Sequence, residues 1–380
     1  MTRPQEPNET LLDVLQRKRD GRNVDPSMGV LSGEGAQQRV KTLERAPGVQ
    51  PSGDGALLPA GAPSYYGLPV LKEPVWIASV PTYLYVGGVA GATSVLGFAA
   101  ELIGGARLRG LARRCVWVGM AGDLLSAGLL IGDLGRPERF LNMLRVFRPT
   151  SPMSIGSWVL AASGAFNTLA LLMGRRSGWP GAVGRAAGAG AALLGLPLSG
   201  YTAVLLTNTA VPLWQSMHRS LPLFFMASAT AASGSLLSLL PHPRHEAPVL
   251  RAFRITGKAV EVATRIAVER DAARVPEIAR PLREGLPGAL WTASKVCAGA
   301  GLLLELLPRR TRGVATAANV LTTVSAVAAR FAIFHAGKVS SRNPQATFQG
   351  QRQGLGAAEV TGHTVASDGK PLKFPLPVVR

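Results

Sequence analysis

Several ionisable side chains of this sequence lie inside long apolar runs, where a charge is costly. A carboxylate, amine or imidazole at that depth is by default a candidate for holding or moving a proton. The structural alternatives are an interhelical hydrogen bond or ion pair, a side chain that reaches back to the surface, or a helix cap. The residues of this kind are Glu101, Asp123, Glu261, Lys295, Glu305 and His335. For a proton path we select Asp123, Glu261 and Lys295, and we expect Glu101 and Glu305 to reach the surface.

Two carboxylates share one apolar run. Asp123 lies eight residues after Cys115, which is about 12 Å along a helix. Asp133 lies ten residues further, about 15 Å up the same helix. One carboxylate is therefore expected at mid-depth and the other at the rim, an order that suits a proton path. In a later run we expect Lys295 to pair with Glu261 or another acid.

The C-terminal end of that apolar run carries further charged residues. Asp133 and Arg136 are three residues apart across a glycine turn, so they are placed to form an ion pair near the water boundary. Such an ion pair either orders a binding site or only stabilises the turn. The next segment, PERFLNMLRVF at 137–147, puts apolar residues on one side and Arg139, Asn142 and Arg145 on the other. With proline at its first position, it predicts a short amphipathic helix lying along a membrane surface.

The composition indicates what must position these residues. Of the 380 residues, 47% are apolar and 17% are charged, whereas about a quarter are charged in an ordinary soluble domain. From Pro74 onward the charges form short groups between long apolar runs, such as 107–114 and 309–312. The net charge of +19 therefore indicates loops beside lipid headgroups, and no nucleic acid. The pattern predicts an all-α, polytopic membrane helix bundle.

A membrane core requires about 20 helical residues per crossing. Seven apolar runs meet that length, at about 75–103, 115–132, 154–174, 187–206, 221–240, 288–308 and 314–337. The prediction is therefore a bundle of about eight transmembrane helices once a further, unusual segment is included.

That segment is VLRAFRITGKAVEVATRIAV at 249–268. Its charges recur at spacings of three and four, at Arg251, Arg254, Lys258, Glu261 and Arg265, so one helical face is charged and the rest is apolar. Five charges facing lipid would cost roughly 12 to 17 kcal/mol. The helix therefore either lies at the interface or turns its charged face into the protein.

The two ends of the chain differ from the apolar part. Residues 1–63 are rich in Pro, Gly and charges of both signs, which predicts a disordered or partner-binding extension. Within them only residues 10–21 favour a helix. We place the transmembrane bundle at 64–340 and a tail at 341–380.

The cysteines and histidines limit the redox groups of this chain. Cys115 and Cys297 are the two cysteines, whereas an iron–sulfur cluster needs about four thiolates. A haem held by two imidazoles is equally disfavoured, because only His335 among the histidines falls in an apolar run. We therefore expect no haem, no iron–sulfur cluster and no metal site in this chain, and we assign no catalytic residue.

Several separated motifs resemble one family. The run DLGRPERFLNMLRVFRPTSPMSIGSW, starting at Asp133, is similar to the signature of the NrfD/PsrC-type integral membrane subunits of polysulfide reductase and formate dehydrogenase-like complexes. The resemblance continues at 64–76, 199–214 and 330–344 and covers about residues 64–352.

The resemblance implies an eight-helix bundle without a prosthetic group, and it favours the protein-facing placement of 249–268. It also implies an exchangeable quinone, menaquinone or ubiquinone, bound near an iron–sulfur ferredoxin-like subunit that works with a molybdopterin-type catalytic subunit. Residue by residue, Trp76, Asp133, Arg136 and Tyr201 match the family's motifs and are the implied quinone-binding residues. Tyr201 is the implied hydrogen-bond donor, although YTA stands here in place of YTG.

Three functions follow as alternatives. The first is electron exchange between an iron–sulfur partner and quinone in a bacterial plasma membrane, with or without coupled proton transfer. The second is a transporter or proton channel that uses Asp123, Glu261 and Lys295. The third is a passive membrane anchor. The distribution of basic residues does not decide the orientation in the membrane.

Overall fold

The computed structural model describes residues 23–25, 30–32, 70–133, 140–174, 176–307 and 311–352. The chain divides into two compact units, Met1–Lys72 and Glu73–Arg380. In the first unit, β1 (Asn23–Asp25) pairs antiparallel with β2 (Val30–Ser32). The helix expected within 10–21, and the C-terminal tail beyond residue 352, lie outside the described residues.

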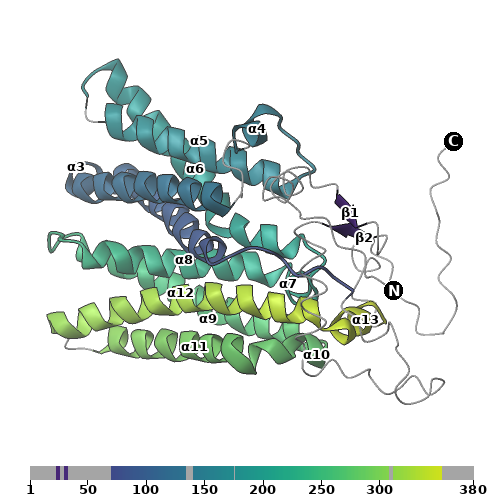
Figure 1. Ribbon diagram of the computed structural model, residues 1–380. Coiled ribbons are helices and arrows are strands. Elements are labelled where there is room, and N and C mark those ends of the chain that lie inside the picture. The colour runs from purple at the N-terminus through teal and green to yellow at the C-terminus, as the bar shows by residue number, and fades with distance from the viewer. Residues whose placement is uncertain are drawn as a thin grey trace, which may run out of the picture. The chain divides into compact units, whose positions relative to one another are not determined.

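In the described residues of the second unit, every secondary-structure element is a helix (Figure 1). Its elements are α3 (Ser79–Asp133), α4 (Phe140–Arg145), α5 (Pro152–Met173), α6 (Trp179–Thr207), α7 (Pro212–Ser216), α8 (Ser220–Leu239), α9 (Ala247–Ala273), α10 (Pro276–Ala279), the 3-10 helix η3 (Arg280–Leu282), α11 (Gly285–Leu306), α12 (Arg312–Arg342) and α13 (Pro344–Arg352).

Helix α3 is a hairpin of two arms. Gly105 interrupts it with φ +48° and ψ −127°, a conformation that glycine adopts at little cost. The arms return side by side, because Ser79 Oγ donates to Asp133 Oδ1 over 2.9 Å across 54 residues. The arms match the expected spans 75–103 and 115–132. The second arm begins earlier than expected, since the basic residues 107–114 are helical.

The described residues contain six helices that are long and apolar enough to cross a membrane: α3, α5, α6, α8, α11 and α12. Helix α3 supplies two crossings, so these helices account for all seven expected apolar spans. The all-α, polytopic fold is therefore confirmed. Helix α5 begins with a side-chain cap, since Ser151 Oγ accepts from the Ser154 amide and Pro152 occupies the first turn.

Helix α9 is the eighth long segment among the described residues. It packs along α8 and lies within the bundle (Figure 1). Arg254, Lys258, Glu261 and Arg265 are buried, whereas Arg251 is exposed. The charged face therefore turns into the protein, as the family resemblance favoured.

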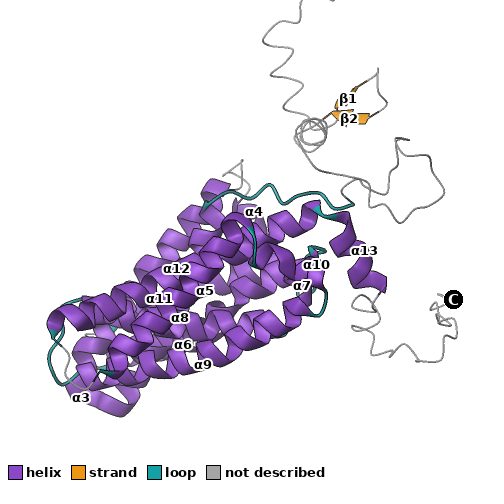
Figure 2. Ribbon diagram, turned by 90° about the horizontal axis from the view of Figure 1, so that it is seen from below, coloured by secondary structure: helices purple, strands orange, loops and turns teal. Residues whose placement is uncertain are grey.

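The long helices form two groups. The arms of α3 pack with α5 and α6, while α8 pairs with α9 and α11 pairs with α12. Contacts of α8 with α3 and α6, and of α12 with α3, join the groups (Figure 2). Within the first group, a Cβ on Gly91 would overlap the Gly195 carbonyl of α6. Small residues at these positions let the two backbones touch.

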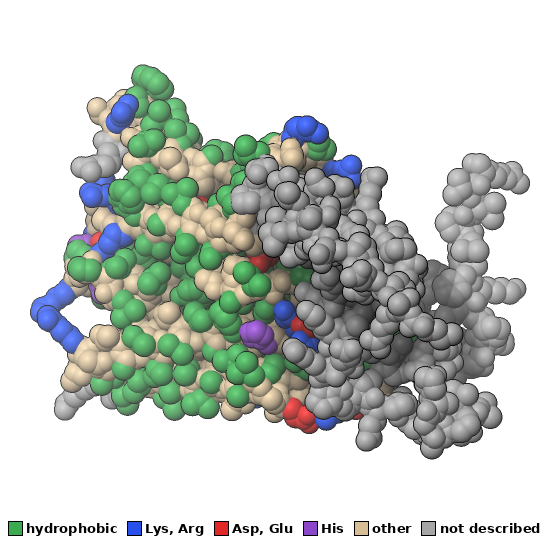
Figure 3. Space-filling view, in the orientation of Figure 1, with side chains coloured by type: hydrophobic (Ala, Val, Ile, Leu, Met, Phe, Trp, Pro, Cys, Tyr) green, Lys and Arg blue, Asp and Glu red, His purple; other side chains and the backbone are tan. Residues whose placement is uncertain are grey.

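The outer face of the bundle is apolar. In Figure 3, hydrophobic side chains cover much of the visible face, and Lys and Arg side chains gather at its ends. The exposed apolar residues come from most of the long helices, among them Leu102, Leu124, Leu172, Leu193, Val296 and Leu303. A broad apolar face of this kind matches a surface covered by lipid.

Candidate functional site

The rim of the bundle carries Asp133, the last residue of α3. Its Oδ1 accepts from Ser79 Oγ over 2.9 Å and from the Ile77 amide over 3.4 Å. Asp133 is half-buried, and its Oδ2 has no hydrogen bond within the described residues. One carboxylate oxygen is thus fixed by the residues at the start of α3. Arg136, its expected partner, lies outside the described residues.

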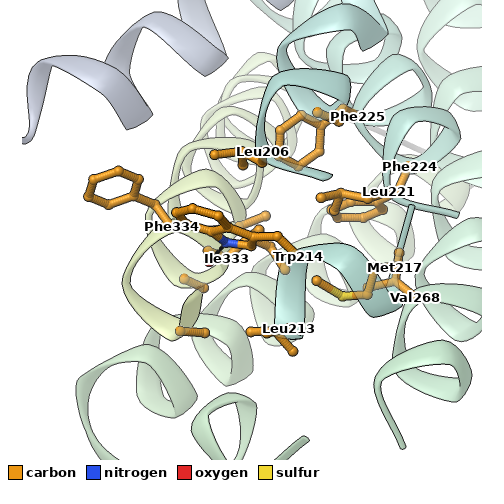
Figure 4. Close-up of a cluster of buried hydrophobic side chains, with 14 of the residues drawn as sticks. Leu206, Leu213, Trp214, Met217, Leu221, Phe224, Phe225, Val268, Ile333 and Phe334 are labelled. Carbon is orange, nitrogen blue, oxygen red and sulfur yellow. Dashed lines mark hydrogen bonds between the residues drawn. The ribbon is translucent and has the colours of Figure 1, made fainter. Parts of the chain in front are cut away.

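Trp76 lies one residue before Ile77 and faces a second indole. Its ring stacks on Trp214 of α7, with the centroids 5.9 Å apart and the planes at 17°. Trp214 in turn stacks on Phe334 of α12 at 6.3 Å and donates from Nε1 to the Ile333 carbonyl over 2.8 Å (Figure 4). This aromatic stack therefore links the segment before α3 to α7 and α12.

A charged group lies beside the aromatic stack. Lys338 Nζ donates to the Trp76 carbonyl over 3.1 Å and lies 5.6 Å from the centroid of the Phe334 ring. Glu73 accepts from Arg342 over 2.7 and 2.9 Å and lies 3.6 Å from Lys338 Nζ. These contacts tie the first residues of the second unit to the end of α12.

Tyr201 of α6 lies against the start of α5. Its hydroxyl donates to the Pro152 carbonyl, and its ring occupies the space where a side chain on Gly156 would lie. Tyr201 is half-buried. Within the described residues no hydrogen bond joins Tyr201 to Asp133 or Trp76, whereas Asp133 accepts from the amide of Ile77, the residue after Trp76.

The expected surface helix is present in part. Helix α4 covers Phe140–Arg145, and residues 137–139 lie outside the described residues. None of its residues is buried, and Leu141 is 73% exposed. Phe147, just after α4, packs edge-on against Trp158 of α5 with centroids 6.1 Å apart. An exposed apolar helix at the bundle's rim is suited to lie at headgroup depth.

Asp123 lies inside the first group of helices. It is 2% exposed, and its Oδ2 accepts from Ser163 Oγ over 2.9 Å and from Asn167 Nδ2 over 2.8 Å. Asn167 also bonds Ser94. The carboxylate thus joins the second arm of α3 to α5, and its Oδ1 has no partner within the described residues.

The second group of helices buries an ion network around Glu305. Arg254 Nε donates to Glu305 Oε2 over 2.7 Å, and Arg254 Nη2 reaches the other carboxylate oxygen. Lys258 Nζ lies 3.2 Å from Glu305 Oε2. Glu305 is 0% exposed. The expectation that Glu305 reaches the surface was therefore wrong, because two cations of α9 hold its carboxylate inside the bundle.

Glu261 belongs to the next turn of α9. Arg265 Nη2 donates to Glu261 Oε1 over 2.6 Å, and Arg265 Nη1 donates to Ser294 Oγ over 3.0 Å. The Arg265 guanidinium also lies 5.0 and 4.9 Å from the centroids of the Phe224 and Trp291 rings. Glu261 is thus neutralised within its own helix, as the four-residue spacing favours.

Lys295 lies apart from Glu261. It pairs with Glu269 over 3.0 Å, and both side chains are more than a third exposed. Glu269 is therefore the acid that satisfies the expected pairing. Within the described residues, no hydrogen bond or ion pair connects any two of Asp123, Glu261 and Lys295.

Sequence reasoning missed Arg330 of α12, which is 0% exposed. It donates to Ser228 Oγ and to the Phe225 carbonyl, each over 2.9 Å, and its guanidinium lies 4.1 Å from the Phe225 ring centroid. Its signal was present in the sequence: it is a single basic residue within the run 313–337. The aromatic partner Trp214 was also missed, because it is far from Trp76 in the sequence.

Across the described residues, no group of three or more His, Cys, Asp or Glu side chains is arranged to hold a metal ion. His335 is half-buried at the rim and packs edge-on against Phe334 with centroids 5.3 Å apart. The site therefore offers a carboxylate oxygen, aromatic faces and a lysine at one end of an apolar bundle.

Comparison with known proteins agrees with this fold. A family model described as polysulfide reductase, of the NrfD type, matches residues 63–342, well over half of the chain. No curated protein matches the chain. The matched range contains the whole hairpin α3, all the other long helices and the rim site. The chain therefore belongs to the NrfD-type polysulfide reductase family and is a multi-pass membrane subunit of a redox complex.

Proposed function

We propose that this chain exchanges electrons between an iron–sulfur partner subunit and a membrane quinone, menaquinone or ubiquinone. The quinone would bind at the rim of the bundle beside Trp76 and Asp133, with Arg136 and Tyr201 as further polar groups. The chain supplies the binding site, and the partner supplies the electrons. Each quinone that is reduced takes up two electrons and two protons and leaves as the quinol.

One observation supports this location most directly. Asp133 Oδ1 is fixed by Ser79 and by the Ile77 amide, next to an indole stack, while Oδ2 has no hydrogen bond within the described residues. A carboxyl group held in this way can bond a quinone oxygen and deliver or accept its proton. The Trp76 ring, one residue before Ile77, would provide an apolar wall, and the exposed Leu141 of α4 would lie at the depth at which quinones diffuse.

Tyr201 requires a change of partner in this scheme. Its hydroxyl proton is donated to the Pro152 carbonyl. To bond a quinone carbonyl, the hydroxyl must rotate away from Pro152 and donate its hydrogen to the quinone oxygen. The Tyr201→Phe variant therefore tests whether the phenol contributes to quinone binding or only fastens α6 to α5.

The partners follow from the same scheme. An iron–sulfur ferredoxin-like subunit would dock at the rim, and a molybdopterin-type catalytic subunit would supply or consume its electrons. Asp123, Glu261 and Lys295 are proposed as proton-handling residues. Since no hydrogen bond or ion pair connects them among the described residues, Asp123 would act in the first helix group, and Glu261 and Lys295 would act separately in the second, rather than in one continuous relay.

The experiment is quinone binding to the purified complex. Co-isolated quinone and subunits are identified, and the affinity of a menaquinone analogue is measured for the wild-type complex and for Asp133→Asn. We expect Asp133→Asn to weaken binding of an analogue that carries a quinol-like hydroxyl by about tenfold or more, since the carboxylate accepts a charge-assisted hydrogen bond from that hydroxyl and the neutral amide does not. Tyr201→Phe is measured alongside.

Tyr85→Phe is the matched control, because it removes a phenol hydroxyl from α3 outside the rim site. Its affinity for the analogue should equal that of the wild type. Equal affinity of wild type, Asp133→Asn and Tyr201→Phe would place the quinone elsewhere. Absence of any quinone or redox partner in the purified complex would favour the passive anchor.

A further inference from the structure

The Asp123 cluster contains a buried carboxylate without a counterion. Asp123 is 2% exposed, and no Lys, Arg or His side chain lies within ion-pair distance of it in the described part of the chain. Its neighbours Ser163 and Asn167 are neutral and equally buried. An ionised carboxylate in such surroundings needs a cation or a proton to offset its charge.

Two oxygens of the cluster lack partners. Asp123 Oδ1 and Ser126 Oγ are both buried and make no hydrogen bond within the described residues. The two residues are three apart on the second arm of α3, so they share one helical face. Buried polar atoms are rarely left unpaired, and an unplaced ion or water is a common reason for an exception.

Glycines let the helices approach closely around these oxygens. A Cβ on Gly119, one turn before Asp123, would lie 2.8 Å from Ser94 Oγ and 3.2 Å from the Asn167 amide atoms. A Cβ on Gly87, in the facing arm, would lie 3.4 Å from Ser126 Oγ. The absence of these side chains leaves hydroxyl, amide and carboxylate oxygens grouped together in the apolar interior.

We propose that Asp123, Ser126, Ser163 and Asn167 form a binding site for a small monovalent cation, Na⁺ in the first instance. The donors are hard oxygens, which favour hard cations over transition metals. One carboxylate balances one positive charge, so a divalent ion would leave an uncompensated charge in the bundle. Asp123 Oδ1 and Ser126 Oγ are the free ligands, and the Ser163 hydroxyl and Asn167 carbonyl keep acceptor lone pairs.

A proton alone explains the cluster less well. A protonated Asp123 would carry its hydrogen on Oδ1, which then needs an acceptor, and no hydrogen bond joins Oδ1 to Ser126 Oγ. The serine would also remain without a partner. A cation between the two oxygens satisfies both at once. The site does not depend on the quinone proposal, because Asp123 lies about 15 Å down the helix from Asp133.

The test is cation-dependent thermal stability of the purified full-length protein, alone or in its complex. Unfolding midpoints are measured in NaCl, KCl and choline chloride at constant ionic strength and pH. A ligand that binds only the folded state raises the midpoint as its concentration increases. We expect Na⁺ to raise the midpoint of the wild type by more than K⁺ or choline does.

Two variants locate the effect. Asp123→Asn keeps the shape of the side chain and should abolish the Na⁺-specific shift. Ser126→Ala keeps the carboxylate but removes one oxygen of the proposed site. The Na⁺ concentration for half-maximal stabilisation should therefore rise by about tenfold or more, which is the usual loss of affinity when a metal site loses a supporting group. Thr93→Val is the matched control, because the Thr93 hydroxyl is buried but bonds only carbonyls of its own helix. Its Na⁺ response should equal that of the wild type.

Three outcomes overturn the proposal. Equal midpoints in Na⁺ and choline exclude a Na⁺ site, as does a rise in stability that follows acidification and is indifferent to Na⁺. An unchanged Na⁺ response in Ser126→Ala excludes this location, and that result is decisive even where Asp123→Asn does not fold. Quinone binding, measured separately, is expected to persist without Na⁺, so the two proposals fail independently.

Discussion

At the scale of single residues, the buried charged side chains of α9 and α11 lie in contact with side chains of opposite charge. Glu305 is surrounded by Arg254 and Lys258, and Glu261 is bonded by Arg265. A buried carboxylate with two cationic partners avoids the cost of an isolated charge. Asp123 differs, since its partners are neutral. This contrast is why Asp123, and not Glu305, is our candidate for an ion-binding group.

The Glu305 network predicts a large mutational effect. Glu305→Gln leaves Arg254 and Lys258 buried without their counterion, so the free energy of unfolding should fall by about 3–5 kcal/mol. Thermal or denaturant unfolding of the purified protein measures the change. Glu284→Gln is the control, because Glu284 pairs with Arg280 where both side chains are 61% exposed, and an exposed pair contributes little. Similar losses in both variants would contradict a special role for burial.

The sequence could not have revealed this network in full. The spacing of charges on 249–268 predicted one charged helical face, and burial of that face is confirmed. The partner was not predictable, because Glu305 is 51 residues from Arg254 and its position near a span end equally suits a surface carboxylate. Pairings of this kind depend on how helices are rotated against each other, which periodicity in one segment does not report.

At the scale of elements, packing depends on a few glycines at helix contacts. Gly337 of α12 lies under the Trp214 ring, and a Cβ at this position would overlap the indole. Trp214 is 0% exposed and stacks on Trp76, so its position affects the rim. A glycine is therefore required where α7 meets α12.

Gly337→Ala should move the indole and destabilise the protein by about 1–3 kcal/mol, the usual cost of overpacking a close contact. Unfolding experiments report the loss, and a change in tryptophan fluorescence reports the displaced ring. Gly128→Ala is the control, because a Cβ there meets nothing within 4 Å. It should be neutral or slightly stabilising, since alanine favours helix over glycine. Equal stability of the two variants would refute the contact.

Element boundaries were largely predictable from apolar length alone. The expected spans 154–174 and 221–240 correspond to α5 (Pro152–Met173) and α8 (Ser220–Leu239). The largest differences concern charged ends: the second arm of α3 includes the basic residues 107–114, and α6 begins at Trp179 rather than near 187. Helices continue past the membrane boundary into water, where hydropathy no longer indicates them.

At the scale of the whole second unit, the long helices alternate in direction, so their connections collect at two ends (Figure 1). One end holds Gly105, Arg176 and Arg244. There His245 Nε2 lies 3.0 Å from the Arg107 carbonyl, and Arg114 bonds Glu246 and the Pro241 carbonyl. The other end holds Asp133, α4, α7, α10 and the aromatic stack. Trp76, Asp133 and Tyr201, the proposed quinone-site residues that the structure describes, lie toward this second end.

This arrangement predicts the sidedness of the connections, and α9 is the decisive helix. If α9 crosses the membrane, residue 244 before it and residue 283 after it lie on opposite faces. If α9 lies along the surface instead, both residues lie on the same face. Burial of Arg254, Lys258, Glu261 and Arg265 against other helices favours the crossing, because a surface helix would turn its charges to water.

Single cysteines placed in a Cys115→Ala, Cys297→Ala background test this with a membrane-impermeant maleimide applied to sealed and to opened vesicles. Arg244→Cys and Arg283→Cys should react from opposite faces. Arg176→Cys should share the face of Arg244→Cys, and Arg145→Cys should share that of Arg283→Cys. All four arginines are exposed, so access to the reagent does not limit the reaction. Reaction of residues 244 and 283 from the same face would show that α9 does not cross the membrane. The burial of its charged side chains would then have no physical explanation.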